Sequence, residues 1–456
     1  MLRAPGLVRP SRSRDGGPYH RGMTLDTAAD PHAEVVPERP PRKRQKRRRR
    51  KRGRLVDRPR TPVELELTGF AAGGVAMGRA PDGRIAFVEF GIPGERVIAE
   101  ITSEESSYIE ARTAMVLEES PERVEPRCEY YGRCGGCQLQ HIAYGEQLRL
   151  KTGVVREQMR RIGRFEDAEV DEILREMIGM NDPWAYRNHM RFTVRRDGDI
   201  GFMEHGTHRF LRVDHCEIAN PEANRVLRNA QGRTMQTKQL TVRVGEHSGE
   251  SLVQPKLRWR PGRRGNVRSG QQHYHELLRG ARYRVSSPAF FQVNSRQAER
   301  LIELVVARAR AVGPRLVADA YSGVGTFAVA LAQVVPDVVT IEASSAAGDD
   351  AEVNLAPYDN VRRITGTVEE QLPALNPQPD VVVVDPPRAG LDASIIETVV
   401  DSDVRRVVYV SCDPATLARD LRRFVVGGFT IAEMQPIDMF PHTQHIECIT
   451  TLDRAE

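Results

Sequence analysis

The sequence lacks features that define several classes of protein. No stretch of its 456 residues approaches the roughly 18 uninterrupted apolar residues of a membrane span. The N-terminus has no apolar core of signal-peptide type. Six cysteines are too few to staple so long a chain as a secreted disulfide scaffold. We therefore expect a cytoplasmic protein with no membrane association, whose cysteines bind metal or act in catalysis.

Acidic residues are absent from residues 42–54, RKRQKRRRRKRGR, which hold eleven basic residues. Without these charges the net charge falls from +5 to −6, so the basic character belongs to a tail. A run that repels itself cannot bury a core, which predicts disorder over residues 1–60. Counterion release would make the tail a non-specific ligand for nucleic acid, although a solubilising tail has the same composition. Met23 is an alternative start of the chain.

Three regions of different periodicity follow the tail. Residues 61–119 alternate apolar and polar residues between Gly and Pro-Asp-Gly turns, which predicts a small β-barrel suited to oligonucleotides. Residues 120–284 combine a helical pattern at 144–163 with β-like segments and an expected loop at 261–277. From residue 285, strands buried on both faces alternate with helices, which predicts a doubly wound parallel sheet over 285–456. We detect no internal repeat.

A glycine loop, DAYSGVGTFA, follows the first strand of this predicted sheet. Gly323 and Gly325 lie in the loop, and Glu342 follows Gly323 by nineteen residues. This spacing is typical of a dinucleotide or nucleoside site in which the acid accepts hydrogen bonds from ribose. Asp319, however, would repel a pyrophosphate. S-adenosylmethionine carries a sulfonium and an ammonium group and no phosphate, so the loop favours this methyl donor over a nicotinamide cofactor.

The segment VVVVDPPRAGL places Asp385 at the carboxyl end of a buried strand, where open α/β sheets bind ligands. Two prolines restrict the loop that follows. In methyltransferases that act on exocyclic amines, the fourth position of this motif is typically aromatic. Here it is Arg388, which counts against amine methylation. The alternative is an Asp-Pro-Pro turn with a structural role alone.

Cys412 ends the next strand, in YVSCDPATLARD, and should share an edge with Asp385. Asp413 is expected to cap a helix that begins at Pro414, and the helix dipole favours a thiolate while Asp413 opposes it. A thiolate that adds to C6 of uracil makes C5 nucleophilic enough to accept a methyl group. The alternative is an inert buried thiol.

Loss of the C5 proton then requires a general base. Glu447 is a polar residue between apolar neighbours in a predicted closing hairpin, and it is our candidate. Cys448 should face the other way along the same strand and serve a structural role.

Three cysteines follow the predicted barrel in a C-x5-C-x2-C pattern, and a fourth lies further along the chain: Cys128, Cys134, Cys137 and Cys216. Four thiolates suit a [4Fe-4S] cluster or structural zinc. The pattern differs from the C-x3-C-x2-C of radical enzymes, which argues against radical chemistry. His141 and His215 are alternative ligands in place of the fourth cysteine.

Taken together, these segments resemble the RNA uracil-C5 (5-methyluridine) methyltransferase family from residue 61 to the C-terminus. The likeness rests on six motifs in a fixed order: CEYYGRCGGCQLQH, FFQVN, DAYSGVGTF, DPPRAG, SCDP and HIE. It implies an α/β protein with a Rossmann-like class I methyltransferase domain at 285–456. An OB-like TRAM barrel at 61–119 and a mixed α+β central domain at 120–284 with a cysteine cluster would precede it.

The resemblance also implies roles for individual residues. The four cysteines would ligate a [4Fe-4S] cluster with a structural or RNA-positioning role, zinc being the alternative. Cys412 would be the nucleophile and Glu447 the proton acceptor. Ser322 stands where the family often has Cys, and Thr367 where it usually has a more polar side chain. The implied S-adenosylmethionine site comprises Gln292, Tyr321, Thr326, Glu342, Thr367 and Asp385.

The implied substrate is RNA, and the resemblance leaves ribosomal and transfer RNA both open. The target uridine must leave its stack to reach Cys412, so we expect a base flipped from a loop or single strand. We expect a monomer. Two alternative functions are an RNA-binding protein without catalysis and a cytosine-C5 methyltransferase. The latter needs an acid near N3 and often a second cysteine in a separate motif, which we do not find.

Overall fold

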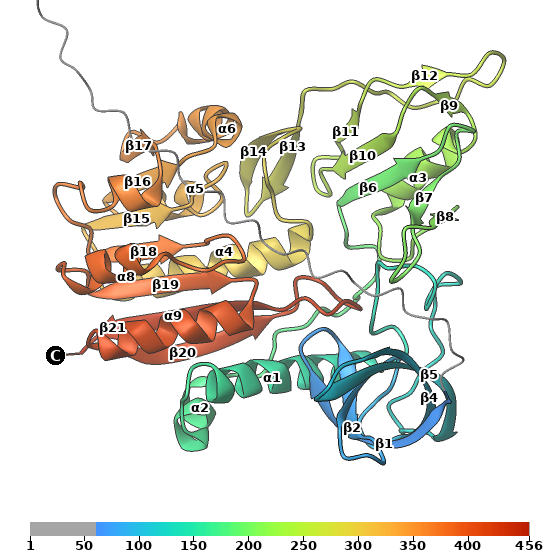
Figure 1. Cartoon of the computed structure of the whole chain (residues 1–456). Coiled ribbons are helices and arrows are strands. Elements are labelled where there is room, and N and C mark those ends of the chain that lie inside the picture. The colour runs from blue at the N-terminus through green and yellow to red at the C-terminus, as the bar shows by residue number, and fades with distance from the viewer. Residues whose placement is uncertain (1–60, 456) are drawn as a thin grey trace, which may run out of the picture. The chain divides into compact units, whose positions relative to one another are not determined.

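The computed structural model describes residues 61–455, which comprise a barrel, a central sheet and a C-terminal sheet (Figure 1). The basic run at 42–54 and the predicted disorder of residues 1–60 lie outside the described residues. Within residues 61–455, no helix combines the length and apolarity needed to cross a bilayer.

The first five strands close into a barrel in the order β1-β2-β3-β5-β4. Their alternating side chains explain the closure, because every second residue, such as Leu65 and Leu67, fills the interior. β3 and β5 pair in parallel and the other neighbours pair antiparallel. The strands are β1 (Val63–Ala71), β2 (Val75–Arg79), β3 (Ile85–Glu89), β4 (Arg96–Glu104) and β5 (Tyr108–Glu118).

The central region contains a five-stranded antiparallel sheet in the order β11-β10-β6-β7-β8, with α3 packed on it. Two further strand pairs, β9 with β12 and β13 with β14, form separate two-stranded sheets. β13 begins inside the stretch 261–277 that was expected to be a loop. The elements are β6 (His189–Val194), β7 (Ile200–Met203), β8 (Phe210–Arg212), α3 (Pro221–Ala230), β9 (Thr234–Met235), β10 (Gln239–Val244), β11 (Ser251–Gln254), β12 (Arg258–Trp259), β13 (His273–Leu278) and β14 (Ala281–Ser286).

The C-terminal sheet has seven strands in the order β17-β16-β15-β18-β19-β21-β20. The first five are parallel, and β21 runs antiparallel between β19 and β20. β18 consists of four valines buried on both faces, as its sequence predicts. The strands are β15 (Leu316–Ala320), β16 (Asp337–Glu342), β17 (Val361–Thr365), β18 (Val381–Val384), β19 (Arg406–Ser411), β20 (Phe429–Ile437) and β21 (Glu447–Arg454).

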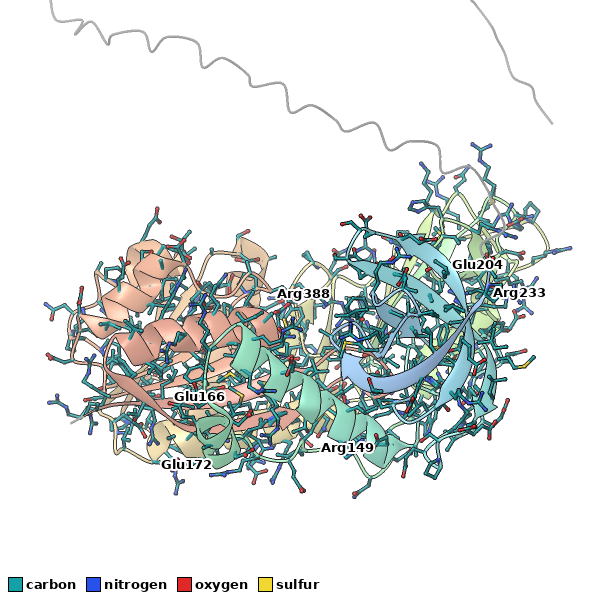
Figure 2. The ribbon with its side chains drawn as sticks, turned by 60° about the horizontal axis from the view of Figure 1, so that its bottom comes forward. Arg149, Glu166, Glu172, Glu204, Arg233 and Arg388 are labelled. Atoms are coloured by element: carbon teal, nitrogen blue, oxygen red, sulfur yellow. The ribbon has the colours of Figure 1, made fainter. Side chains whose placement is uncertain are left out.

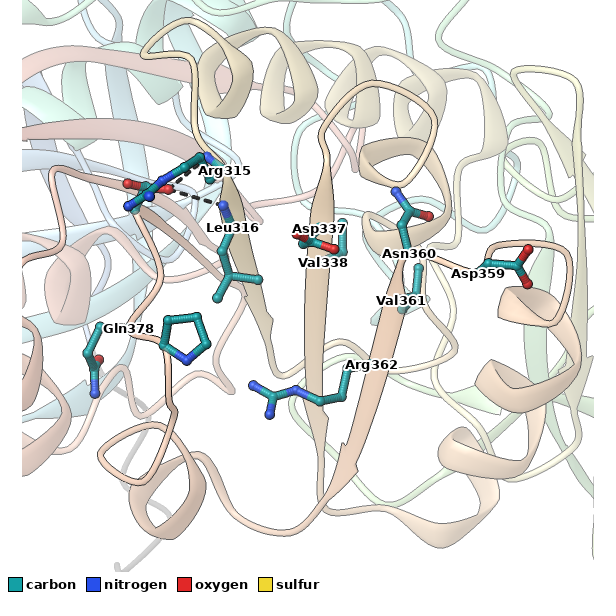
Figure 3. Close-up of a pocket in the computed structure, with 11 residues that line it drawn as sticks. Arg315, Leu316, Asp337, Val338, Asp359, Asn360, Val361, Arg362 and Gln378 are labelled. Carbon is teal, nitrogen blue, oxygen red and sulfur yellow. Dashed lines mark hydrogen bonds between the residues drawn. The ribbon is translucent and has the colours of Figure 1, made fainter.

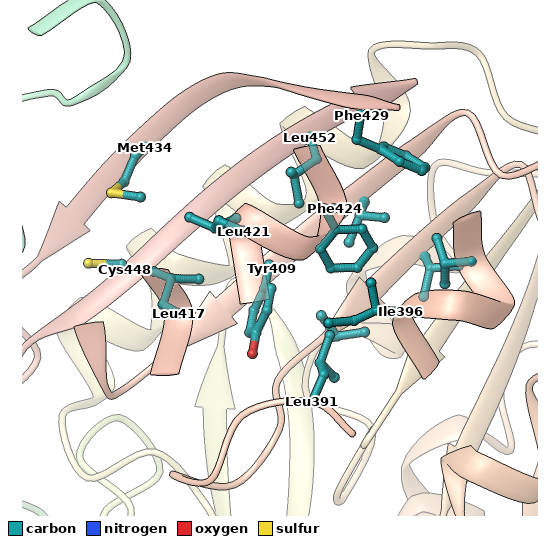
Figure 4. Packing of buried hydrophobic residues seen from close by; sticks show 14 of the residues in the cluster. Leu391, Ile396, Tyr409, Leu417, Leu421, Phe424, Phe429, Met434, Cys448 and Leu452 are labelled. Carbon is teal, nitrogen blue, oxygen red and sulfur yellow. The ribbon is translucent and has the colours of Figure 1, made fainter. Parts of the chain in front are cut away.

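Helices cover both faces of this sheet, which confirms the predicted α/β class with a Rossmann-like sheet and an OB-like barrel. On one face α9 places Leu417, Leu421 and Phe424 against Tyr409 and Leu452 (Figure 4). On the other face α4, α5 and α6 bury a second core. The helices are α4 (Ser295–Arg310), α5 (Ala328–Leu331), α6 (Ser345–Leu355), α7 (Val368–Gln371), α8 (Ala393–Val400) and α9 (Pro414–Val426).

The helix predicted at 144–163 is α1 (Tyr144–Arg161), and α2 (Asp167–Ile173) follows it. Although α1 precedes the central sheet in sequence, it packs against the C-terminal sheet. Val154 and Met159 belong to the same buried cluster as Leu417 of α9. A segment far from the C-terminal sheet in sequence thus supplies part of its core, and Figure 1 shows α1 running alongside the edge of the sheet at β20.

Candidate active site

The predicted site residues gather at the carboxyl edge of the C-terminal sheet. Asp385 follows β18 directly, Cys412 follows β19, and Glu342 is the last residue of β16. Parallel strands bring these ends to one edge, which is where such sheets bind ligands.

Strand register places Cys412 beside Glu447. β19 and β21 are antiparallel with Ser411 opposite Cys448, so the next residue on β19's side, Cys412, comes opposite Glu447. Glu447 is only 4% exposed, whereas Cys412 is half-buried. Cys448 points to the opposite face and is fully buried in the apolar core (Figure 4).

Four ionisable side chains act on one another at this position. Burial, and then the charges of Glu447 and Asp385, raise the pKa of the Cys412 thiol to about 11, although the Arg388 guanidinium opposes the rise. Burial raises the pKa of Asp385 to about 7. Burial, and then the Asp385 charge, raises the pKa of Glu447 well above its usual value, again opposed by Arg388. Arg388 therefore favours the charged forms of both the thiol and the carboxyl.

The loop after β18 is tied to the start of α9. Asp413 caps this helix, as predicted, because its Oδ1 accepts hydrogen bonds from the backbone N–H groups of Ala415 and Thr416, both at 3.0 Å. The Thr416 hydroxyl donates to the Arg388 carbonyl at 3.2 Å. The Asp-Pro-Pro-Arg loop and the Cys412 loop are thereby held together.

The glycine loop is fixed by the carboxylate of Glu342. Gly323 N–H donates to one oxygen at 2.8 Å, and Ser344 N–H donates to the other at 2.6 Å. Gly325 has a positive φ of 86°, and a Cβ there would lie 3.3 Å from Leu355, so glycine suits this position. The Tyr321 hydroxyl donates to Glu369 at 3.3 Å.

Asp319 brings a further carboxylate to this edge. It is 1% exposed, and one oxygen accepts from Ala328 N–H at 2.9 Å while the other has no hydrogen-bond partner. Burial, helped by the charges of Asp385 and Glu342 and opposed by the Ala328 hydrogen bond, raises its pKa to about 8. An unpartnered buried carboxylate oxygen beside two more acids fits a cationic ligand, which is the charge that a sulfonium and an ammonium group carry.

The remaining residues of the predicted donor site lie on segments around the same loop. Gln292 is 7% exposed between β14 and α4, and its carbonyl accepts from the Asn188 side chain at 3.1 Å. The Thr326 carbonyl accepts from the Tyr283 hydroxyl at 3.2 Å. Thr367 is exposed at the start of α7 and makes no side-chain capping bond, and its neighbour Gly366 donates to the Glu342 carbonyl.

The four predicted metal-binding cysteines line a single cavity of about 570 Å³. All are free thiols, and burial raises the pKa of each. Negative charge on Cys216 further raises the pKa of Cys137, so the two thiols lie close together. Within residues 61–455, no three Cys, His, Asp or Glu side chains converge closely enough to hold a single metal ion.

The two histidines considered as alternative ligands have other partners. His141 Nδ1 lies 2.6 Å from the Tyr131 hydroxyl, and its Nε2 lies 3.4 Å from the Gly91 carbonyl. His215 Nε2 lies 3.5 Å from Glu217. The cysteine cavity therefore favours Cys216 as the fourth member of the set.

His445 is a residue of the HIE motif to which the sequence analysis assigned no role. It lines the cysteine cavity, and its Nδ1 lies 3.5 Å from Arg388 Nη2. Burial lowers its pKa to about 4, so the ring is neutral at pH 7. It connects the edge carrying Cys412 to the cysteine cavity. Its place two residues before Glu447, at the end of the polar run HTQH, was the signal in the sequence.

A separate cavity of about 470 Å³ lies at the opposite edge of the sheet, at the amino ends of β15, β16 and β17 (Figure 3). Its wall includes Arg315, Asp337 and Arg362, and it contains none of the predicted site residues. The carboxyl edge thus remains the candidate active site.

Comparison with known proteins agrees with this geometry. Residues 272–455 match the family model described as tRNA (Uracil-5-)-methyltransferase. An RNA methyltransferase of Gloeobacter violaceus is 34% identical, with 86% of this chain and 96% of that protein covered. An RNA methyltransferase of Streptomyces avermitilis is also 34% identical, with 86% and 98% covered.

The fold has a solved counterpart. The crystal structure of Pyrococcus abyssi tRNA (uracil-54, C5)-methyltransferase in complex with S-adenosyl-L-homocysteine superposes with a TM-score of 0.66 at 24% identity. The match covers 85% of this chain and all of that one. With the relatives' similarity over nearly their whole lengths, the chain belongs to the RNA uracil-C5 methyltransferase family and is an S-adenosylmethionine-dependent RNA methyltransferase.

Proposed function

We propose that the chain methylates C5 of a uridine in RNA through a covalent bond between Cys412 and C6 of the base. The observation that carries this proposal is the antiparallel register of β19 and β21, which brings Cys412, directly after β19, beside Glu447 at the start of β21. A nucleophile and a proton acceptor on one rim, next to the glycine loop, are the groups that C5 methylation of uracil needs.

The residues would act in a fixed order. The Cys412 thiolate adds to C6, and the electron pair of the C5–C6 double bond makes C5 nucleophilic. Bound S-adenosylmethionine would supply the electrophilic methyl group that C5 takes, its S–CH3 bond breaking to leave S-adenosylhomocysteine. Glu447 then takes the C5 proton, the double bond re-forms, and the C6–S bond breaks to release the thiolate. Arg388 supports both groups because it favours the thiolate and the ionised carboxyl.

The methyl donor would be held by the carboxylates at the sheet edge. Asp319 and Asp385, whose pKa values burial raises, would ionise as the cationic donor binds and face its sulfonium and ammonium groups, and Glu342 would offer acceptors to its ribose. The unpartnered oxygen of Asp319 supports this assignment. The other proposed members of the donor site are Gln292, Tyr321, Thr326 and Thr367.

We further propose that the four cysteines hold a [4Fe-4S] cluster with a structural or RNA-positioning role. A zinc ion would need its sulfurs about 2.3 Å from one point. A four-iron cluster takes each thiolate on a different iron and so needs a wider space. The cavity of about 570 Å³ with four thiols in its wall supports the larger group.

The substrate would be a uridine flipped out of a loop or single strand, in ribosomal or transfer RNA. The barrel, which is suited to oligonucleotides, would bind the RNA together with the central region. Mapping 5-methyluridine in total RNA of a strain lacking the gene would identify the RNA and the position.

The direct test is transfer of labelled methyl groups to uridine-containing RNA by the purified protein. We expect Cys412→Ala to abolish turnover and Glu447→Gln to accumulate a protein–RNA adduct that survives denaturing electrophoresis. Cys448→Ala is the matched control, because it removes a neighbouring thiol that faces the core. Product chromatography separates 5-methyluridine from 5-methylcytidine. An undiminished rate for Cys412→Ala would end the proposal.

A further inference from the structure

A basic cavity of about 740 Å³ lies in the central region, near the short strands β9 and β12 (Figure 1). Four positively charged side chains line it: Arg196, Lys238, Arg260 and Arg263. None of its lining residues within the described part of the chain is acidic. The cavity shares no residue with the candidate active site or with the cysteine cavity.

The charge of Arg260 is held in place without a carboxylate. Its Nε donates to the Thr234 carbonyl at 3.2 Å, and its Nη2 donates to the Arg196 carbonyl at 2.8 Å. Gly198, with a φ of 84°, leaves the necessary room, because a Cβ there would lie 2.7 Å from the Thr234 carbonyl oxygen and 3.3 Å from Arg260 Nε. Backbone carbonyls orient this guanidinium and leave its positive charge uncompensated.

Neighbouring arginines of the same sheet are used differently. Arg195 lies 3.9 Å from Asp197, and Arg212 lies 3.3 Å from Asp199. Such pairs neutralise each other, whereas the four cations around the cavity have no acidic partner among residues 61–455. Their charge is available to an anion from outside the chain.

The surrounding sequence is strongly basic. Residues 223–275 contain eleven Lys and Arg and only two Glu, although the chain without residues 42–54 is net negative. Arg233, whose carbonyl accepts from Arg260 N–H at 2.9 Å, is exposed in this part of the molecule (Figure 2). The cavity thus lies within a region of the chain that is rich in basic residues.

We infer that this cavity binds phosphates of the RNA backbone; the identity of the anion rests on the proposed RNA methylation. Guanidinium groups bind phosphate oxygens in pairs, and unpaired arginines release counterions on binding. A space of about 740 Å³ is larger than one phosphate needs, and Met235 and Pro261 add apolar wall for a ribose. Phosphate contacts set the register of the RNA and carry no base information, so they should govern affinity rather than the chemical step.

The test compares two pairs of exposed arginines in the full-length protein. Arg196→Gln with Arg263→Gln removes two charges at the cavity. Arg310→Gln with Arg362→Gln removes two exposed charges from the C-terminal domain and is the matched control. Filter binding of substrate RNA across salt concentrations needs no methyl transfer, so it reads binding even if the proposed reaction fails.

We expect the cavity variant to bind RNA about tenfold more weakly and to lose about two units from the salt-dependence slope. The KM for RNA should rise similarly, with kcat and the KM for methyl donor unchanged. The affinity of the control variant for RNA should stay within about twofold of that of the parent, because its two lost charges contribute only non-specific attraction. Equal affinities and slopes of the two variants would overturn the inference. A second result would also overturn it. If inorganic phosphate at constant ionic strength raised the melting temperature of the parent but not of the cavity variant, and the parent and the cavity variant bound RNA equally well, the cavity would be a site for a free anion.

Discussion

The Lys151 Nζ atom lies 2.7 Å from Asp438 Oδ1, and both side chains are almost fully shielded from solvent. Lys151 belongs to α1, and Asp438 directly follows β20 at the start of the loop that leads to Glu447. Lys151 also donates to the Phe440 carbonyl, and the Tyr144 hydroxyl donates to the second Asp438 oxygen at 3.0 Å. A helix from the first half of the chain therefore anchors the loop before the proposed base.

The middle of this loop is held from the same side. Gln147 of α1 donates to His442 Nδ1 at 3.2 Å and accepts from His442 N–H at 3.1 Å. The backbone N–H groups of Gln138 and Leu139 both donate to the His442 carbonyl at 3.0 Å. The segment that directly follows Cys137 is thus bonded to the loop that ends at Glu447.

Lys151→Met should destabilise the protein strongly, because it leaves the Asp438 carboxylate buried without a counter-charge. Loss of one partner of a buried pair is worth about 3–5 kcal/mol. We expect a lower melting temperature and a reduced kcat, with partial recovery of stability in Lys151→Met combined with Asp438→Asn. Arg149→Gln, on the same helix, breaks an ion pair whose arginine is largely exposed and should change stability by less than about 1 kcal/mol (Figure 2). Equal melting temperatures of the two single variants would contradict this role.

Alkylation of Cys412 by iodoacetamide should be slow at pH 8 and rise about tenfold per pH unit, because only the thiolate reacts and the thiol pKa is about 11. Glu447→Gln removes a negative charge that raises this pKa, so it should speed alkylation at pH 8. Arg388→Gln removes a positive charge and should slow it. Mass spectrometry of the Cys412 peptide measures the rate separately from the other cysteines. Slower alkylation in Glu447→Gln and faster alkylation in Arg388→Gln than in the parent would refute the proposed electrostatics.

Asp319→Asn should raise the melting temperature at pH 9 by several degrees and have a much smaller effect at pH 5. The folded pKa of about 8 lies above the usual value, so the folded protein holds this proton more tightly than the unfolded chain. Stability from this group is present in acid and is lost as pH rises through about 8, whereas asparagine does not ionise. Asp337→Asn, at the exposed start of β16, should show no such trend. Calorimetry should find weaker methyl-donor binding by Asp319→Asn alone.

Anaerobic purification should yield a brown protein with about four irons per chain and a broad visible absorption band. Cys137→Ser and Cys216→Ser should lose iron and absorption, since both thiols line the cavity. Cys448→Ser, which alters a buried thiol away from the cavity, is the control for general loss of stability. One zinc and no iron in protein prepared this way would refute the cluster.

The carboxyl edge of the sheet was predictable because strand ends can be located from sequence. The run of four valines before Asp385, and the Cys-Asp-Pro sequence after β19, mark positions that a parallel sheet must bring together. The closing hairpin was expected, but its sequence did not indicate that β21, and not β20, pairs with β19 and brings Glu447 beside Cys412.

The contacts between distant segments could not be predicted. Lys151 and Asp438 are separated by 287 positions, and nothing in either local pattern indicates the other. The amphipathic pattern of α1 shows a buried face but not which sheet it covers. β13 was missed because its short alternation, HYHELL, follows an arginine-rich stretch typical of loops.

The ladder between β19 and β21 joins Cys412 and Glu447, the proposed nucleophile and proton acceptor, in one rigid unit. Six consecutive residue pairs, from Arg406 with Asp453 to Ser411 with Cys448, fix their separation. The reacting uracil must therefore adapt to the fixed positions of these two side chains. The barrel and the basic central surface lie on other parts of the chain. Chemistry and choice of RNA can then diverge independently: replacing the recognition regions should redirect the same reaction to a new transcript.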